Sequence, residues 1–312
     1  MLDYPAEFLD LLIDVIRRLP VWLPGTFMTH HDNVRGIIAT LVVCFVCGAL
    51  GSLVVGNRMA FFSDALAHCA FAGVGLGLLI CLLADTPDDL IRQRITLIMV
   101  AFGVSIGIMI AYVREKTGLA SDTVIGVFYA GSIGLGAIFT RVVQRRQFFS
   151  IEDFIFGNPT SARSWEVVLL IGLAVATAVF LIFMYNWIVL ASANPSLALS
   201  RRVPVRLSRY LFIILLALMV NLSQQIVGTL LINGLLIVPA AAAANVANNL
   251  RQMFWWSIVL AVATGGVGYV LSWEISCQFH QTFTVGISGT IVVLSVLTFA
   301  STMVIGRWVR QA

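Results

Sequence analysis

Two side chains that can bind a metal ion, Asp64 and His68, stand four residues apart in a stretch without other charges, Met59–Ala84. A carboxylate at bilayer depth costs about 2.5–3.5 kcal/mol on insertion, so an unpaired one there indicates a functional site. In a helix, this spacing places both side chains on one face, about 6 Å apart along the axis. A carboxylate oxygen and an imidazole nitrogen placed in this way can share one divalent cation.

The composition predicts that the segments around this pair cross a membrane. Of the 312 residues, 60% are hydrophobic and only 11% are charged, whereas a soluble domain carries about 25% charged residues. We therefore expect an all-α, polytopic transmembrane helix bundle. The net charge of +4 comes from arginines in short loops, which is typical of membrane topology and gives no reason to expect a nucleic-acid partner.

The chain lacks the motif of a nucleotide-binding loop. Its single lysine, Lys116, follows Glu115, whereas such a loop needs Gly-Lys followed by Ser or Thr. We therefore expect a protein that is not an enzyme and that depends on another subunit for any use of ATP.

Apolar runs predict eight or nine spanning helices. No charge occurs between Arg209 and Arg251, a length of about two crossings. The polar residues 221–225 would divide this run into two crossings, and the count falls to eight if one of the pair is re-entrant. Pro239 within the run is expected to break a helix. The other crossings are Gly36–Gly56, Met59–Ala84, Ile95–Val113, Thr123–Thr140, Val167–Leu190, Gln252–Trp273 and Thr282–Gly306.

The first 35 residues differ from the rest. Asp3 and Glu7 stand where a signal peptide would carry basic residues. Apolar residues recur there with a helical period, at Phe8, Leu11, Leu12, Val15, Ile16 and Leu19. We therefore expect an amphipathic extension over residues 1–35 that lies on the membrane surface, followed by a transmembrane domain over residues 36–312.

Other polar residues give weaker indications of a site. His30, His31 and Asp32 form a possible ligand cluster before the first crossing, and His280 lies in the last outer loop, but such groups are more often solvated turns. Cys69 follows His68, yet the next residue in a helix is turned by about 100°, which argues against a thiolate ligand. Cys44 and Cys47 have CxxC spacing within a crossing, where we expect packing residues. Asp64 and His68 could also be hydrogen-bonded groups inside the bundle.

Four blocks of sequence carry a family resemblance. The stretch GSLVVGNRMAFFSDALAH from Gly51 to His68 resembles the permease subunits of zinc-, manganese- and iron-importing ABC transporters, with their "RM" turn and "DAxxH" element. The segments SDTVIG from Ser121 and IFGN from Ile155 are similar to two further family blocks. The run VGTLLINGLLIVPAAAA from Val227 is similar to the last one.

The resemblance implies a multi-pass protein of the bacterial plasma membrane, embedded in lipid. It implies a homodimer, or a pair with a related permease, served by two copies of an ABC ATPase subunit and by an extracytoplasmic metal-binding protein. A coupling helix that docks into the ATPase is expected at about 194–206, and this places the loop in the cytoplasm. Family members often have an acidic residue near Ser196 and glycine at the position of Arg202, and this chain departs from both patterns.

These expectations combine into one function, the import of a divalent transition metal ion, zinc or manganese, with iron as a further candidate. Two-fold symmetry would supply four ligands, Asp64 and His68 from each subunit. The metal is cargo, and no permanently bound cofactor is expected. An ion-coupled secondary transporter without an ATPase is the alternative, with Asp64 as a proton carrier. An intramembrane metalloenzyme is disfavoured because no HExxH motif is present.

Overall fold

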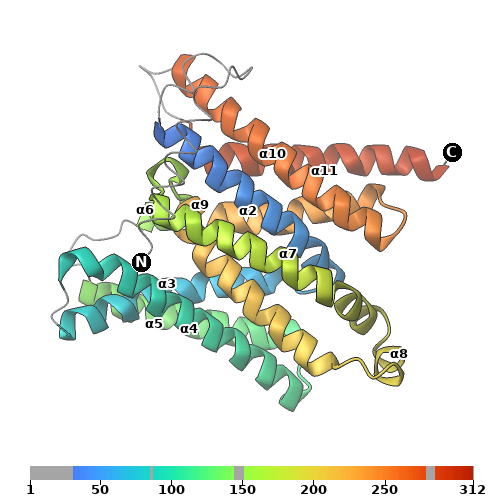
Figure 1. Ribbon diagram of the computed structural model, residues 1–312, viewed down its shortest axis with the longest axis horizontal. Coiled ribbons are helices and arrows are strands. Elements are labelled where there is room, and N and C mark those ends of the chain that lie inside the picture. Colours follow the sequence, from blue (N-terminus) through green and yellow to red (C-terminus); the bar gives the residue numbers. More distant parts are fainter. Residues whose placement is uncertain (1–30, 85–86, 144–150, 279–284, 312) are drawn as a thin grey trace. The chain divides into compact units, whose positions relative to one another are not determined.

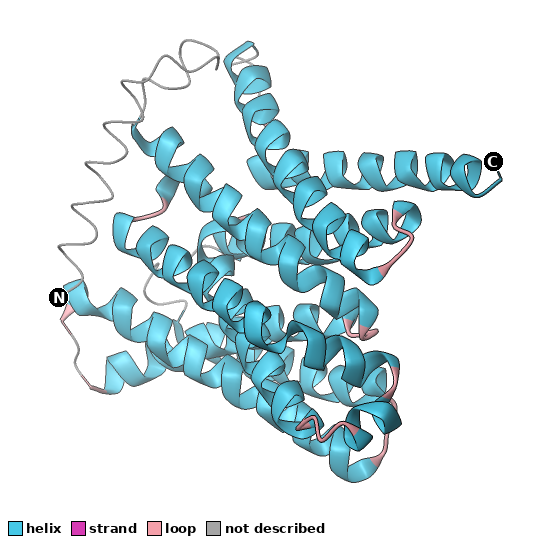
Figure 2. Cartoon of the chain, turned by 45° about the vertical axis from the view of Figure 1, so that its right-hand side comes forward, coloured by secondary structure: helices cyan, strands magenta, loops and turns pink. Residues whose placement is uncertain are grey.

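Long uncharged runs form helices in this chain, because a backbone in lipid must satisfy its own hydrogen bonds. The computed structural model describes residues 31–84, 87–143, 151–278 and 285–311. Throughout these ranges the chain is helical apart from short turns, and no strand occurs in them (Figures 1 and 2). The predicted all-α class is confirmed.

Eight helices in the described part of the chain are long and apolar enough to cross a membrane, which is one of the two predicted counts. They are α2 (His31–Gly56), α3 (Ala60–Leu83), α4 (Asp88–Thr117), α5 (Ser121–Val143), α7 (Ser164–Ala193), α9 (Val205–Val246), α10 (Leu250–Gln278) and α11 (Ile287–Gln311). Short elements are α6 (Ile151–Phe156), α8 (Pro195–Ser200) and the 3-10 turn η2 (Pro159–Ser161).

The predicted surface extension falls largely outside the described residues. Residues 1–30 are not described, and residues 31–35 form the beginning of α2. The helix thus starts five positions earlier than the predicted crossing from Gly36.

Helix α9 corrects two predictions. The helix continues through residues 221–225, and its backbone leaves helical geometry at Gly228, with φ 80° and ψ 162°. The predicted division at 221–225 is therefore wrong. Asn221 and Gln224 are fully buried, and the missing side chain of Gly103 on α4 makes room for Asn221. The predicted break at Pro239 is also wrong, because α9 runs on to Val246.

The described residues divide into two compact units. The first takes in residues up to Val55, Ile155–Ala178 and residues from Gln225 on, and the second takes in Gly56–Phe154 and Val179–Gln224. Helices α7 and α9 are each divided between the two units, with one part of the helix in the first unit and the other part in the second. Helices α3, α4, α5 and α8 belong entirely to the second unit.

In the first unit, glycines bring helices into backbone contact, as small residues do in lipid. Gly48 on α2 lies against Ile258 on α10, and the Ser257 hydroxyl donates a 2.8 Å hydrogen bond to the Gly48 carbonyl. Gly268 on α10 lies equally close to Ile291 on α11. Gly48 and Gly268 therefore mark close contacts between helices.

A backbone junction joins α6, α9 and α11 within the first unit. Gly157 and Gly228 both have positive φ, 66° and 80°, and a Cβ on Gly228 would collide with the Gly157 nitrogen. The Ser288 hydroxyl, at the start of α11, donates to the carbonyls of Phe156 and of Val227, the latter at 3.1 Å. The junction requires glycine for both its conformation and its close approach.

In the second unit, α3 lies between α4 and α5. On one face, Gly73 and Gly77 of α3 approach the backbone of α4 at Met99 and Ile95. On another face, Gly75 of α3 approaches Phe139 of α5, and Phe71 of α3 lies against Gly136 of α5. Contacts on both sides fix the rotation of α3 about its axis.

The short helix α8 lies within the segment predicted for coupling. The Asn194 side chain caps it by accepting a 3.2 Å hydrogen bond from the Leu197 amide, a standard stabilisation of a helix start. After α8, Arg202 adopts a left-handed conformation with φ 56°, and the Val203 amide donates back to the Ala198 carbonyl at 3.0 Å. The glycine common in the family at this position suits that conformation.

Replacement of Gly228 by alanine tests the backbone junction. We expect Gly228→Ala to lower the free energy of unfolding by more than about 2 kcal/mol, because it adds left-handed strain to a steric clash. Thermal unfolding of the purified protein in detergent measures this. The control is Gly172→Ala on α7, where no atom lies within 4 Å of an added Cβ. Equal stability of the two variants would contradict the claim that the junction requires glycine at position 228.

Replacement of Arg202 by glycine tests the turn after α8. We expect Arg202→Gly to raise the free energy of unfolding by about 1 kcal/mol, because glycine adopts positive φ without strain. The matched change Arg201→Gly, at an ordinary φ of −84°, should give no gain. The comparison uses the same unfolding assay, and a gain from both changes would refute the assignment of strain to Arg202.

Candidate metal site

Helix α3 carries Asp64 and His68 on one face. The His68 Nε2 lies 3.7 Å from the Asp64 Oδ1, and the two side chains are 37% and 38% exposed, respectively. Most of the other residues of α3 are buried against α4 and α5. The predicted pair is therefore brought together, at a position where both side chains remain accessible from outside the chain.

Helix α5 holds the neighbourhood of His68 in place. The rings of His68 and Tyr129 meet edge to face, with centroids 4.8 Å apart and an interplanar angle of 81°. One residue further along α3, the Cys69 sulfur lies 2.8 Å from the Ser132 hydroxyl. Tyr129 and Ser132 are three residues apart on α5, so one face of α5 makes both contacts.

The ligands available from one chain are few. Among the described residues, no group of three or more His, Cys, Asp or Glu side chains could hold a metal ion. The Cys69 thiol contacts Ser132, and the expectation that Cys69 is not a ligand stays a prediction. One chain thus offers one carboxylate and one imidazole at this position, half of the tetrahedral set that divalent zinc commonly takes.

The weaker candidates do not gather into a second site in the described structure. His30 and His280 lie outside the described residues, His31 begins α2, and Asp32 beside it is exposed. Cys44 and Cys47 are buried free thiols, and the Cys44 sulfur lies against Gly265 of α10, where a Cβ would collide with it. This close contact supports the predicted packing role.

Tyr129 is the residue of this neighbourhood that sequence reasoning missed. It stands 61 positions from His68 and belongs to no metal-binding motif. The sequence offers only a weak signal for its role. Tyr129 and Ser132 lie on one face of a glycine-rich helix, shortly after the SDTVIG block that begins at Ser121.

Comparisons with known proteins identify the family of this chain. The family model described as the ABC 3 transport family matches residues 30–305. The manganese import system permease protein ScaB of Streptococcus gordonii is 28% identical over 269 residues, covering 86% of this chain and 89% of the relative. The high-affinity zinc uptake system membrane protein ZnuB of Haemophilus influenzae is 25% identical over 237 residues, 76% and 86% of the two chains.

Solved structures show the same fold. PsaBC from Streptococcus pneumoniae, in complex with Fab, superposes with a TM-score of 0.71 at 25% identity, over 88% of this chain and 92% of that one. A putative metal-chelate type ABC transporter in an inward-facing conformation gives a TM-score of 0.63 at 14% identity, over 96% and 97%. With eight apolar helices of spanning length among its described residues and a family match over most of its length, this multi-pass bacterial membrane protein belongs to the ABC 3 transport family.

Proposed function

We propose that this protein is the permease subunit of an ABC importer for a divalent transition metal ion, manganese or zinc, with iron as a further candidate. The observation that carries the proposal is the Asp64–His68 pair, held on one face of α3 with both side chains partly exposed. The relatives named as manganese and zinc permeases support the choice of cargo.

The ligand chemistry supports a shared site. Imidazole and carboxylate together suit manganese, iron and zinc, but two ligands are too few to hold such an ion firmly. A second copy of the chain, related by a two-fold axis, would supply another Asp64 and His68. A four-ligand site built from two subunits can form and separate as those subunits move, as a transported ion requires.

The energy for import must come from a partner. The chain has one lysine, which follows Glu115 and is not part of a Gly-Lys-Ser/Thr motif. We assign ATP hydrolysis to separate ATPase subunits, two copies in the assembly, and metal delivery to an extracytoplasmic binding protein.

Helix α8 is the proposed docking element for the ATPase. Leu197 and Leu199 on it are 44% and 66% exposed, as expected for an apolar contact with a partner. The chain continues from α8 into α9, where Arg206 pairs with Glu115 of α4 at 2.8 Å. The Tyr210 hydroxyl donates to the same carboxylate at 3.3 Å.

These contacts form a continuous path through the second unit. Glu115 is near the end of α4, and α4 packs on α3 at Gly73 and Gly77, which follow Asp64 and His68 along α3. A movement of α8 can therefore act on the metal ligands through α9, α4 and α3, which is the type of connected network that coupling between sites requires.

Removal of either proposed ligand tests the site. We expect Asp64→Asn and His68→Gln each to weaken manganese or zinc binding at least about tenfold and to abolish rescue of an uptake-deficient strain at limiting metal. Titration calorimetry on the purified assembly and growth at controlled metal concentration measure the two effects. Cys69→Ser is the control, because a serine at this position can keep a hydrogen bond with Ser132.

Three results, from growth rescue and from uptake measurements, separate the importer from the alternatives. Full rescue by either ligand variant would contradict the ligand role. Metal uptake into vesicles that contain the permease alone, driven by a pH gradient, would favour an ion-coupled secondary transporter. Dependence of uptake on the ATPase and on ATP supports the importer.

Replacement of Glu115 tests the coupling path. Glu115→Gln removes the charge that Arg206 pairs with, and Lys116→Gln is the neighbouring control. Since Arg206 is largely exposed, we expect a change of less than about 1 kcal/mol in stability and unchanged metal binding, but several-fold slower ATP-driven uptake. Uptake at the wild-type rate would remove this contact from the path.

A further inference from the structure

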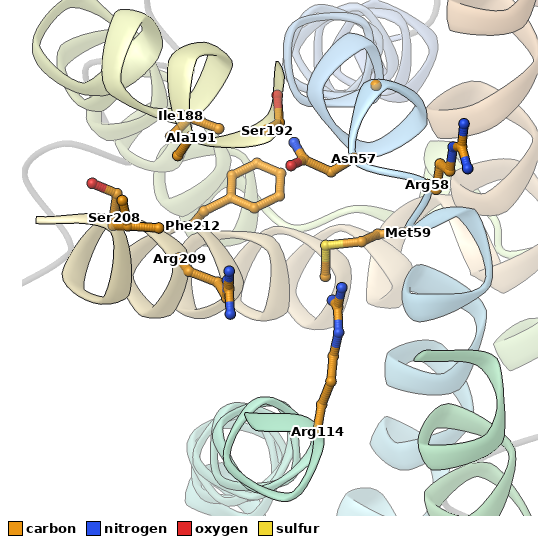
Figure 3. A pocket seen from close by; sticks show the side chains of 12 residues that line it. Asn57, Arg58, Met59, Arg114, Ile188, Ala191, Ser192, Ser208, Arg209 and Phe212 are labelled. Carbon is orange, nitrogen blue, oxygen red and sulfur yellow. The ribbon is translucent and has the colours of Figure 1, made fainter. Parts of the chain in front are cut away.

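A basic pocket lies within the second unit, where four helix ends meet. Its volume is about 390 Å³, and its walls come from the α2–α3 turn, the end of α4, the end of α7 and the start of α9 (Figure 3). Three arginines line it: Arg58, Arg114 and Arg209. In Figure 3, the side chains of Arg114 and Arg209 extend into the space between α4 and α9. Arg58 lies beyond Met59, with its side chain turned away from the other two arginines.

The charge of this pocket is positive. Guanidinium groups stay protonated in proteins, and no carboxylate belongs to the pocket lining. Outside the lining, in the described part of the chain, Glu115 pairs with Arg206, and the charge of Asp122, at the start of α5, acts on Arg114. The lining thus holds three positive charges and no negative one, and these two acids lie outside it. Because of this excess of positive charge, the pocket favours an anion.

The same charge makes this pocket unsuitable for the proposed cargo. Three guanidinium groups repel a divalent cation, and they offer it no lone pair. The pocket therefore has a different ligand from the site at Asp64 and His68.

The lining combines polar and apolar parts. Beside the arginines lie Phe212, Ile188 and Met59, which are only 2%, 5% and 6% exposed. Arg114 stands in the last turn of one spanning helix, and Arg209 in the second turn of another, so the pocket lies at a membrane boundary. A phosphate group fits the bidentate geometry of arginine, and a glycerol or acyl segment fits the apolar residues.

We infer that this pocket binds the phosphate of an anionic phospholipid from the cytoplasmic leaflet. Basic pockets between spanning helices on that side bind such headgroups. The inference rests on the orientation in the proposed function, with α8 toward the cytoplasm. A bound lipid would contact Arg114, the neighbour of Glu115, and would thus reach the contact proposed to couple α8 to α4.

The test measures binding of soluble short-chain lipids to the purified full-length permease in a neutral detergent. The probes are dioctanoyl phosphatidylglycerol, dioctanoyl phosphatidylcholine and inorganic phosphate. We expect phosphatidylglycerol to bind saturably and to raise the unfolding midpoint, and phosphatidylcholine to do neither. With about fivefold in affinity for each basic residue at a membrane surface, Arg114→Gln/Arg209→Gln should weaken phosphatidylglycerol binding about thirtyfold.

Two further sets of variants serve as controls for the lipid-binding measurement. Arg251→Gln, an exposed arginine at the start of α10, should bind phosphatidylglycerol like the wild type. If the double glutamine variant is unstable, Arg114→Lys/Arg209→Lys keeps the charge and should retain part of the affinity. Equal binding of both lipids, or unchanged binding by the double glutamine variant, would overturn the inference.

Two further results would reassign the pocket. Inorganic phosphate that binds as tightly as phosphatidylglycerol would identify a site for free anions. Wild-type lipid binding by the double glutamine variant, together with loss of the ATPase subunit on co-purification, would identify a protein contact. Because the lipid measurement uses neither metal nor ATPase, its failure leaves the proposed importer function unaffected.

Discussion

The need to keep one carboxylate, Asp64, out of hydrocarbon is the constraint on which the arrangement of the second unit depends. A charged group in a spanning helix must face protein, water or an ion instead of hydrocarbon. Helix α3 meets this demand by burying its small apolar residues against α4 and α5. The face with Asp64 and His68 stays partly exposed, and this is the face that the second subunit of the proposed assembly would cover.

Glycine packing makes this orientation of α3 possible. Where Gly73 and Gly77 meet α4, and where Gly75 meets α5, an added Cβ would collide or come into tight contact. Contacts of this kind replace the hydrophobic drive that is missing between helices in lipid. Because they are made on two sides of α3, they fix which way the pair Asp64 and His68 points as well as how deep it lies.

Much of this could be predicted from the sequence, for identifiable reasons. Helix class follows from the length of the apolar runs, since only helices and closed barrels satisfy a backbone in lipid. The pair Asp64 and His68 is local, four residues apart on one helix, so its proximity needed no tertiary information. The segment predicted for coupling likewise contains a short helix, because Asn194 and Pro195 form a helix start that the sequence displays openly.

The errors and omissions have a common cause in tertiary packing. Polar residues at 221–225 were expected to interrupt α9, but Gly103 on α4 provides space that lets Asn221 stay inside the helix bundle. The actual interruption falls at Gly228, where Gly157 approaches. The sequence around Gly228 does not show that the helix is interrupted there, because the cause is a contact with a residue 71 positions away. The contact of Tyr129 with His68 joins separate helices, and no spacing rule for a single helix could reveal it.

The contact between Cys69 and Ser132 has a consequence for the choice among ions. A thiolate next to His68 would favour soft, thiophilic ions such as Cu(I). Here the sulfur is directed to a hydroxyl on α5, and the groups left on the accessible face are one oxygen and one nitrogen donor. At the proposed site, a thiophilic ion would therefore find no sulfur ligand from this helix, which would add to the selection made by the binding protein that delivers the metal.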